Sequence, residues 1–265
     1  DDNKAVDHLL EEWATPHTYP LQPGMAEIQI FDAQARFNLN GLHNTANQPE
    51  VQTQRFKNLL AELGLDSSIA DRARRFIDAE SMVDNDYLSA EPPYRASYEL
   101  FKHPSEIMLV SGVDQAAYRQ LLPYITALPV AATLNVNTAS NKVMAALSSR
   151  WSLEEADGVI SERGEKGFAD VDAFWGLSAV QEFHEGSNVE GENKPAEVWD
   201  KSDFSVNSQY FEVFSRVTLA DRIATVEMLI YRNAETGDMR TYYRDYSRTD
   251  ARAVVVDESN NSTVQ

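Results

Sequence analysis

The chain contains 265 residues, and 23 lysine and arginine residues against 42 aspartate and glutamate residues give a formal net charge of −19 at pH 7. This charge argues against nucleic acid and membrane-surface partners, because cationic side chains supply the favourable part of both interactions. The chain has no cysteine, which excludes disulfide scaffolds, thiolate metal sites and cysteine nucleophiles. No apolar run approaches the ~18 residues of a membrane span, so the sequence predicts a soluble fragment or mature form.

Apolar side chains recur at helical spacing near the start of the chain. The pattern predicts an amphipathic helix that Pro16 ends. Its apolar positions are Ala5, Val6, Leu9, Leu10 and Trp13.

A strand pattern follows from Glu27 to Leu42. Ile28 and Ile30 share one face, whereas the apolar residues from Phe31 to Leu39 have the other parity. A strand that changes parity contains an extra residue, so we expect a β-bulge near 30–31.

Helical patterns then run from about residue 44 to residue 177. Apolar stripes predict helices over Phe56–Leu63, closed by Gly64, and over Ile69–Ile77. Further helix starts are marked by capping residues and by one Ser-x-x-Glu capping box, and a last short helix is expected over 168–177. The predicted caps are Ser105, Asp114 and Ser152, the last paired with Glu155.

The C-terminal third begins with a region rich in Gly, Asn and Glu, from about Phe183 to Lys201, which predicts a loop. Alternating segments over 211–219, 226–230 and 242–243 then predict a three-stranded meander. The economical fold is α+β, with a helical domain over 44–205 inserted between residues 1–43 and 206–248 of a smaller domain. Residues 249–265 form a polar tail.

Motifs for catalysis are not found. The five histidines lie far apart in the sequence, and no phosphate-binding loop, dinucleotide fingerprint or nucleophile elbow is present. We therefore predict no catalytic residues, and a hydrolase of unrecognised type is the weaker alternative.

An acidic stretch between two predicted helices is a candidate calcium site. Oxygen ligands suit calcium, and a bound cation would neutralise carboxylates held close together. A solvated acidic loop is the alternative interpretation. The candidate ligands are Asp78, Glu80, Asp84 and Asp86, with Asp200 and Asp203 as a second candidate pair.

Residues Leu134–Ser140 and the two helical patterns that follow are similar to a helix-hairpin-helix unit. In DNA-binding members a Gly-x-Gly hairpin presents backbone N–H groups to a phosphate, whereas Ser148–Ser152 contains no glycine. A helix-hairpin-helix DNA receptor is therefore the second function considered, and the net charge counts against it.

Several segments stand in the order found in one protein family. The chain resembles the general secretion pathway protein K family, the K-type minor pseudopilins of the bacterial type II secretion system. The segments are Asp32-Ala-Gln-Ala-Arg-Phe-Asn-Leu-Asn-Gly-Leu42, Phe76-Ile-Asp-Ala-Glu80, Tyr87-Leu with Tyr94-Arg-Ala, Ser105-Glu106, Leu121-Leu-Pro-Tyr124, Ala127-Leu-Pro129 and Leu134-Asn-Val-Asn-Thr-Ala139.

The resemblance implies a pilin-like domain, in which an N-terminal helix packs on a small antiparallel sheet, interrupted by a large all-α domain with a helix-hairpin-helix (SAM-like) unit. It implies a periplasmic protein without enzymatic activity that caps the tip of the pseudopilus with the I- and J-type minor pseudopilins. These subunits are the expected partners, with secreted substrates as further candidates.

The resemblance also implies an inner-membrane anchor through an N-terminal helix, with a leader cut by prepilin peptidase, and calcium as a cofactor. We expect Leu9, Leu10 and Trp13 to pack partly on the pilin sheet and partly on partner helices. Packing within the chain alone is the alternative. The family stretch that corresponds to Asp78–Asp86 is commonly longer, with a Gly-Ala-Glu-Asp run, which Ser81-Met-Val-Asp84 replaces here.

Overall fold

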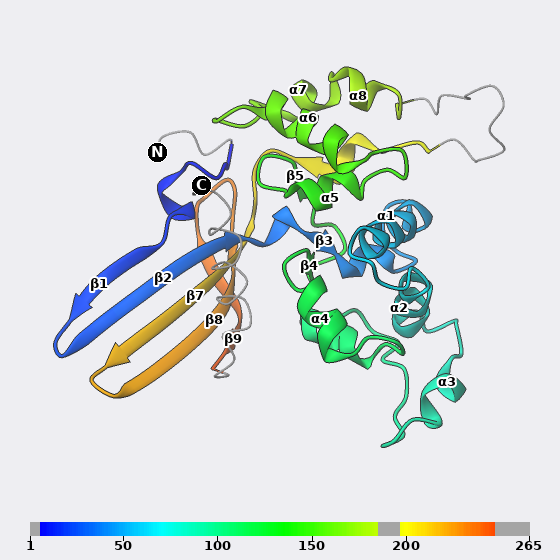
Figure 1. Ribbon diagram of the computed structural model, residues 1–265, viewed down its shortest axis with the longest axis horizontal. Coiled ribbons are helices and arrows are strands. Elements are labelled where there is room, and N and C mark those ends of the chain that lie inside the picture. Colours follow the sequence, from blue (N-terminus) through cyan, green and yellow to red (C-terminus); the bar gives the residue numbers. More distant parts are fainter. Residues whose placement is uncertain (1–5, 185–196, 247–265) are drawn as a thin grey trace.

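An antiparallel sheet extends from one side of a group of short helices (Figure 1). This computed structural model describes residues 6–184 and 197–246. The sheet has five strands in the order β1-β2-β7-β8-β9. The strands are β1 His17–Leu21, β2 Gly24–Asp32, β7 Tyr210–Leu219, β8 Arg222–Arg232 and β9 Met239–Asp245.

The central pair of strands joins distant parts of the chain. β2 pairs with β7 from Gly24 opposite Leu219 to Asp32 opposite Phe211. This pairing and the hairpins of β7, β8 and β9 confirm that the sheet is antiparallel and that the C-terminal segments form a meander. The exact domain boundaries, 1–43, 44–205 and 206–248, stay a prediction, and the polar tail lies outside the described residues.

The predicted bulge near residue 30 is wrong. The β2–β7 register is continuous, and the strand instead ends at Asp32 in a 3-10 turn, η2 Ala33–Ala35. The Asp32 carboxylate accepts a hydrogen bond from the Gln34 N–H, which fixes this turn and changes the parity. The described bulge lies between Leu229 and Ile230 of β8.

The predicted N-terminal helix is also wrong within the described residues, where one 3-10 turn, η1 Glu12–Ala14, is found. The Asp7 N–H donates to the Val206 carbonyl, so tertiary contacts hold the chain extended before it turns. The predicted helix, which Pro16 would end, is too short for its own hydrogen bonds to compete with such contacts. Strand β1, which contains Pro20, was not expected; proline is tolerated there because β1 is an edge strand.

The helical block contains eight α-helices among the described residues. The predicted stripes correspond to α1 and α2, and Gly64 follows α1 with a φ of +68°. The α-helices are α1 Pro49–Glu62, α2 Ile69–Ile77, α3 Asp84–Leu88, α4 Gln115–Leu121, α5 Asn141–Ala145, α6 Leu153–Arg163, α7 Val171–Trp175 and α8 Ser178–Gln181. The 3-10 turns are η3 Leu39–Leu42, η4 Pro104–Leu109 and η5 Lys201–Asp203.

The sequence predicted a purely helical block, but the block also contains short strands. Two short parallel strand pairs cross it, and they connect segments far apart in the chain. The pairs are β3 Phe37–Asn38 with β4 Ile125–Thr126, and β5 Leu134–Asn135 with β6 Phe204–Ser205.

The helix caps agree with prediction in two of three cases. Asp114 caps α4, and Ser152 with Glu155 forms the capping box of α6. Ser105 is not the cap of η4. The His103 ring nitrogen accepts the Ser105 N–H instead, because the helix begins at Pro104, two residues earlier than a Ser105 cap would require.

Buried asparagines hold the loops between these elements. Asn40 donates to the Phe101 and Leu128 carbonyls and accepts the Phe101 N–H. Asn137 likewise donates to the Phe168 carbonyl and accepts its N–H. Each side chain thus replaces a missing backbone partner, as buried peptide groups require. The two Asn-x-Asn segments that suggested the family therefore have a structural role.

Gly167→Ala is expected to lower the free energy of unfolding by about 2 kcal/mol or more, because φ is +74° and a Cβ would lie 2.5 Å from the Asn137 Cγ. Gly158→Ala in α6 is the matched control, since nothing lies within 4 Å of its Cβ position. That variant should gain about 0.5–1 kcal/mol from better helix propensity. Urea denaturation of both variants measures the two free energies of unfolding. Equal changes in the two variants would contradict the prediction for Gly167.

Candidate partner-binding site

One face of the sheet is apolar along three adjacent strands and the edge strand β1. Residues opposite one another in an antiparallel ladder share a face, so the register identifies its members. These residues, named here the apolar sheet face, are Tyr19, Leu21, Ala26, Ile28, Ile30, Val213, Val217, Leu219, Ala224, Val226, Met228 and Ile230. All are half-buried or exposed, with Tyr19 at 51% and Leu219 at 42% exposure.

The opposite face packs on the helical block at one end. Tyr210 and Leu229 cluster there with Leu128 and Ala33. Next to them, the Arg36 guanidinium lies 2.5 Å from the Glu212 carboxylate, and burial lowers the pKa of Arg36. The side that packs internally is therefore not the apolar sheet face.

The N-terminal segment crosses the end of the apolar sheet face that lies nearest the helices. Trp13 packs edge-on against Phe211, with ring centroids 5.3 Å apart, and its indole N–H donates to Glu11. Leu9 and Leu10 are 50% and 66% exposed. Of the three predicted partner-binding residues, the structure thus places one on the chain's own sheet and two at the surface.

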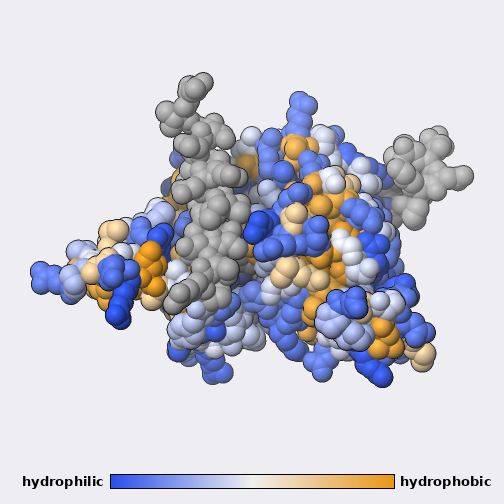
Figure 2. All heavy atoms as spheres, turned by 60° about the horizontal axis from the view of Figure 1, so that its bottom comes forward, coloured by the Kyte–Doolittle hydropathy of each residue, from blue (hydrophilic) through white to orange (hydrophobic). Residues whose placement is uncertain are grey.

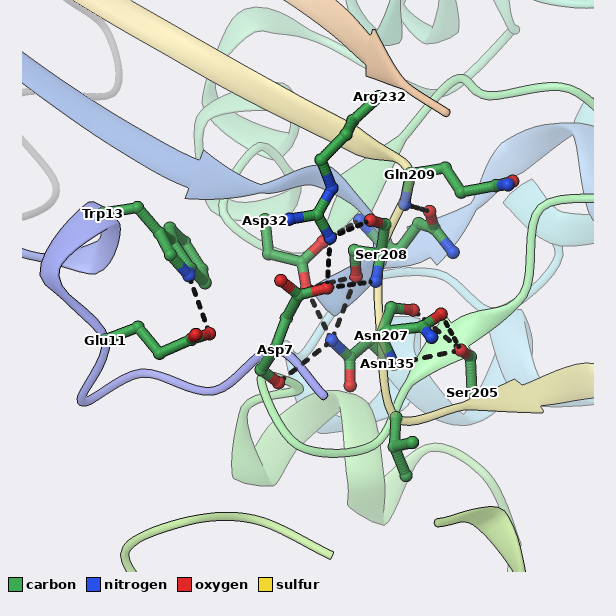
Figure 3. Close-up of polar contacts among 12 residues, drawn as sticks. Asp7, Glu11, Trp13, Asp32, Asn135, Ser205, Asn207, Ser208, Gln209 and Arg232 are labelled. Carbon is green, nitrogen blue, oxygen red and sulfur yellow. Dashed lines mark hydrogen bonds and ion pairs between the residues drawn. The ribbon is translucent and has the colours of Figure 1, made fainter. Parts of the chain in front are cut away.

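A network of polar side chains anchors this segment (Figure 3). Asp7 accepts a hydrogen bond of 2.7 Å from the Ser208 N–H and lies 2.5 Å from the Arg232 guanidinium. Arg232 also donates to the Ser208 carbonyl and lies over the Phe211 ring. We name the polar junction as the set Asp7, Asp32, Asn135, Thr138, Ser208 and Arg232.

Asp32 is the central acceptor of the polar junction. Its Oδ2 accepts from the Thr138 hydroxyl at 2.6 Å, from the Ser208 hydroxyl at 2.7 Å and from the Asn135 amide at 3.0 Å. Burial raises the pKa of Asp32, although these hydrogen bonds oppose the rise. The polar junction therefore joins β2, β5 with the turn that follows it, the segment before β7, β8 and the N-terminal segment at one buried point.

Sequence reasoning missed the polar junction. Two of the segments that resemble the family contain three residues of the polar junction, Asp32, Asn135 and Thr138. Ser208 begins a segment, Ser208-Gln-Tyr-Phe211, that resembles the family more weakly. Asp7 and Arg232 carried no signal, because the partners of Asp7 are 201 and 225 residues away in the chain.

The first candidate calcium ligands do not converge. Asp84 and Asp86 pair with Arg95 and Arg75 respectively, and Asp78 accepts from Asn44. Glu80 is exposed. Guanidinium groups thus supply positive charge that a cation would otherwise provide.

The second candidate pair lies closer together. Asn47 donates to Asp200 and to Asp203, both at 3.0 Å, while Asp203 pairs with buried Arg55 at 2.7 Å. In the described ranges 6–184 and 197–246, no group of three or more carboxylate or histidine side chains could hold a metal ion. This arrangement does not fit calcium as it stands, so calcium binding stays a prediction. A calorimetric titration with millimolar calcium tests it, and a titration without heat of binding would contradict it.

The hairpin between α5 and α6 points inward. Ser148 and Trp151 are buried, and Arg150 pairs with Glu182. The Arg150 N–H donates to the Ser148 hydroxyl. A hairpin packed in this way does not offer its backbone donors to a phosphate, which weighs against the DNA-binding alternative.

A cleft of about 460 Å³ lies between α1 and residues 128–134. Arg55 and Asp203 line it and are paired with each other, and no histidine is among its lining residues. The cleft therefore presents hydroxyl groups without a neighbouring base, and it gives no support to the hydrolase alternative.

Within the described parts of the chain, no helix has both the length and the apolar character needed to cross a bilayer.

Models of the family "Type II secretion system (T2SS), protein K" match residues 35–130 and 134–191. Type II secretion system protein K of Pseudomonas aeruginosa is 34% identical over 255 residues, which cover 91% of this chain and 71% of that protein. The protein of the same name from Pectobacterium carotovorum subsp. carotovorum is 29% identical, over 61% of this chain and 56% of its own length.

The fold is also similar to a solved structure. One chain in the crystal structure of the GspK-GspI-GspJ complex from the enterotoxigenic Escherichia coli type 2 secretion system matches with a TM-score of 0.73 and 25% identity. The match covers 93% of this chain and 89% of that chain. Sequence and structure agree, and the chain belongs to the type II secretion system protein K family.

Proposed function

We propose that this protein is a minor pseudopilin that assembles with I- and J-type minor pseudopilins and caps the tip of the type II secretion pseudopilus. There it supports the export of folded proteins from the periplasm. The observation that carries the proposal is the similarity over 93% of the chain to a chain solved in a GspK-GspI-GspJ complex. The role is architectural, with no catalysis of its own.

The apolar sheet face supplies the physical basis for assembly. Water-exposed apolar area of this kind gains free energy when a helix with an apolar stripe covers it, at roughly 25 cal/mol per Å². Leu9 and Leu10, in the N-terminal segment that crosses one end of the apolar sheet face, add further exposed apolar side chains. We therefore assign helices of the I- and J-type subunits to this region.

The helical block makes the protein bulky on one side of the sheet (Figure 1). A subunit that joins a fibre through its sheet and carries a large head is suited to the end of the fibre, because the head leaves no room for the next subunit. The proposal includes a periplasmic location, with anchoring in the inner membrane before assembly.

Labelling tests the tip position. A peptide tag inserted in the hairpin turn at Asp221 and decorated with gold should appear at one end of isolated pseudopili in electron micrographs. Label distributed along the fibres would contradict capping, even if the protein assembles with its partners.

A further inference from the structure

Four large apolar side chains are exposed on α3, on the segment before it and on η4. We name them the head patch: Met82, Leu88, Met108 and Leu109, which are 85%, 46%, 40% and 46% exposed. Figure 2 looks at the molecule from this side and shows hydrophobic atoms among hydrophilic ones.

Contacts between tyrosines hold the two elements of the head patch together. The Tyr94 hydroxyl donates to the Leu109 carbonyl at 2.8 Å. The Tyr94 ring packs 5.3 Å from that of Tyr87, which precedes Leu88 in α3. The surface is thus built on packed residues, and Tyr87 and Ile107 beneath it are buried.

Backbone conformation gives a second reason to examine this surface. Met82 has a φ of +51°, in the left-handed region that residues with a side chain seldom adopt. A methionine that is both strained and 85% exposed gains nothing from packing inside this chain. Methionine side chains are adaptable and polarizable, which suits them to binding apolar partners of varied shape.

Charge around the head patch is net negative. Residues 78–91 contain five carboxylates, of which Asp84 and Asp86 pair with Arg95 and Arg75; among the described residues, Asp78, Glu80 and Glu91 form no ion pair. Glu80 and Glu91 are exposed. A second copy of this chain would bring like charges together, and an anionic lipid surface would be repelled in the same way. The surface therefore selects a cationic partner.

We propose that the head patch docks a cationic amphipathic helix of a protein partner. The apolar stripe of such a helix would cover the methionine and leucine side chains, and its lysine or arginine residues would face the surrounding carboxylates. In Figure 1, α3 lies on the side of the helical block away from the sheet, and the apolar sheet face is the side of the sheet that does not pack on the block, so both surfaces can be occupied at once.

The test uses a fluorescent probe peptide of 18 residues, composed of leucine and lysine at helical spacing, and fluorescence anisotropy of the full chain at low and high salt. Binding is expected to weaken as salt rises. The double variant Leu88→Ser with Leu109→Ser should weaken binding about tenfold, which corresponds to about 1.4 kcal/mol. Glu80→Lys with Glu91→Lys should weaken it most at low salt.

Matched controls separate this surface from general stickiness. Met25→Ser with Ile223→Ser removes side chains of similar exposure, 40% and 54%, which lie on the sheet but outside the apolar sheet face, and should leave probe affinity unchanged. Circular dichroism confirms that each variant is folded. Equal probe affinity of the head-patch variant and the unaltered protein would overturn the proposal, as would equal binding of a scrambled peptide or of a leucine–glutamate peptide. Assembly with the I- and J-type subunits should be unaffected by the head-patch variant, so the two proposals fail separately.

Discussion

Asp32→Ala is expected to lower the free energy of unfolding by about 2–4 kcal/mol. The substitution removes the acceptor shared by the Thr138 hydroxyl, the Ser208 hydroxyl and the Asn135 amide, all of which are buried. Buried donors without an acceptor are costly, whereas the loss of a buried charge returns part of that cost. The midpoint of urea denaturation measures the effect.

Asp221→Ala is the control for this prediction. Asp221 is exposed in the turn between β7 and β8, so its replacement should change the free energy of unfolding by less than about 0.5 kcal/mol. If both variants unfold at the same urea concentration, the polar junction does not stabilise the fold as described.

The raised pKa of Asp32 predicts a pH dependence of definite sign. In the unfolded state, the Asp32 carboxyl loses its proton near the ordinary pKa of 3.8. In the folded state, burial keeps the carboxyl protonated to a higher pH. Stability contributed by Asp32 is therefore greatest below 3.8 and falls as pH rises through the folded-state pKa.

Asp32→Asn cannot titrate and isolates this effect. The stability difference between the unaltered protein and the asparagine variant should shrink as pH rises from 3.8 to 7. A difference that grows with pH would show that hydrogen bonding outweighs burial and that the folded-state pKa is lowered.

Ile28→Glu is expected to weaken assembly with the I- and J-type subunits by about 100-fold, or 2.7 kcal/mol. Ile28 lies in β2 at the middle of the apolar sheet face, opposite Ser215 of β7 and His17 of β1. A carboxylate there loses its hydration when an apolar helix covers the sheet. Isothermal titration of the variant with the two partner subunits measures the change.

Gln29→Glu is the matched control, because Gln29 is the next residue of β2, is also half-buried and faces the other way. It should assemble with nearly unchanged affinity. Equal weakening by both variants would mean that the effect is global, and unchanged affinity of the Ile28 variant would place the interface elsewhere.

Much of the fold follows from local pattern. The α1 and α2 stripes, the capping box of α6 and the meander were predictable, because each depends on residues close in sequence. The first segment was not. Its apolar spacing suited a helix, but Asp7 is held by Ser208 and Arg232, and no local rule contains those contacts.

Some features of the candidate site were also predictable from the sequence, and others were not. The apolar alternation of β2 and β8 was visible in the sequence, whereas the polar junction depends on strand register between residues far apart. The acidic stretch from Asp78 to Asp86 looked like one cluster, yet arginines from α2 and from the loop after α3 separate its members. Spacing in sequence could not supply that information, because those arginines belong to other segments.

The most direct measurement of the central claim is analytical ultracentrifugation of this protein mixed with the I- and J-type minor pseudopilins of the same organism. We expect the separate boundaries to be replaced by one faster boundary, whose mass corresponds to one copy of each subunit. A protein that stays monomeric at high concentration with both partners present would contradict the proposed assembly.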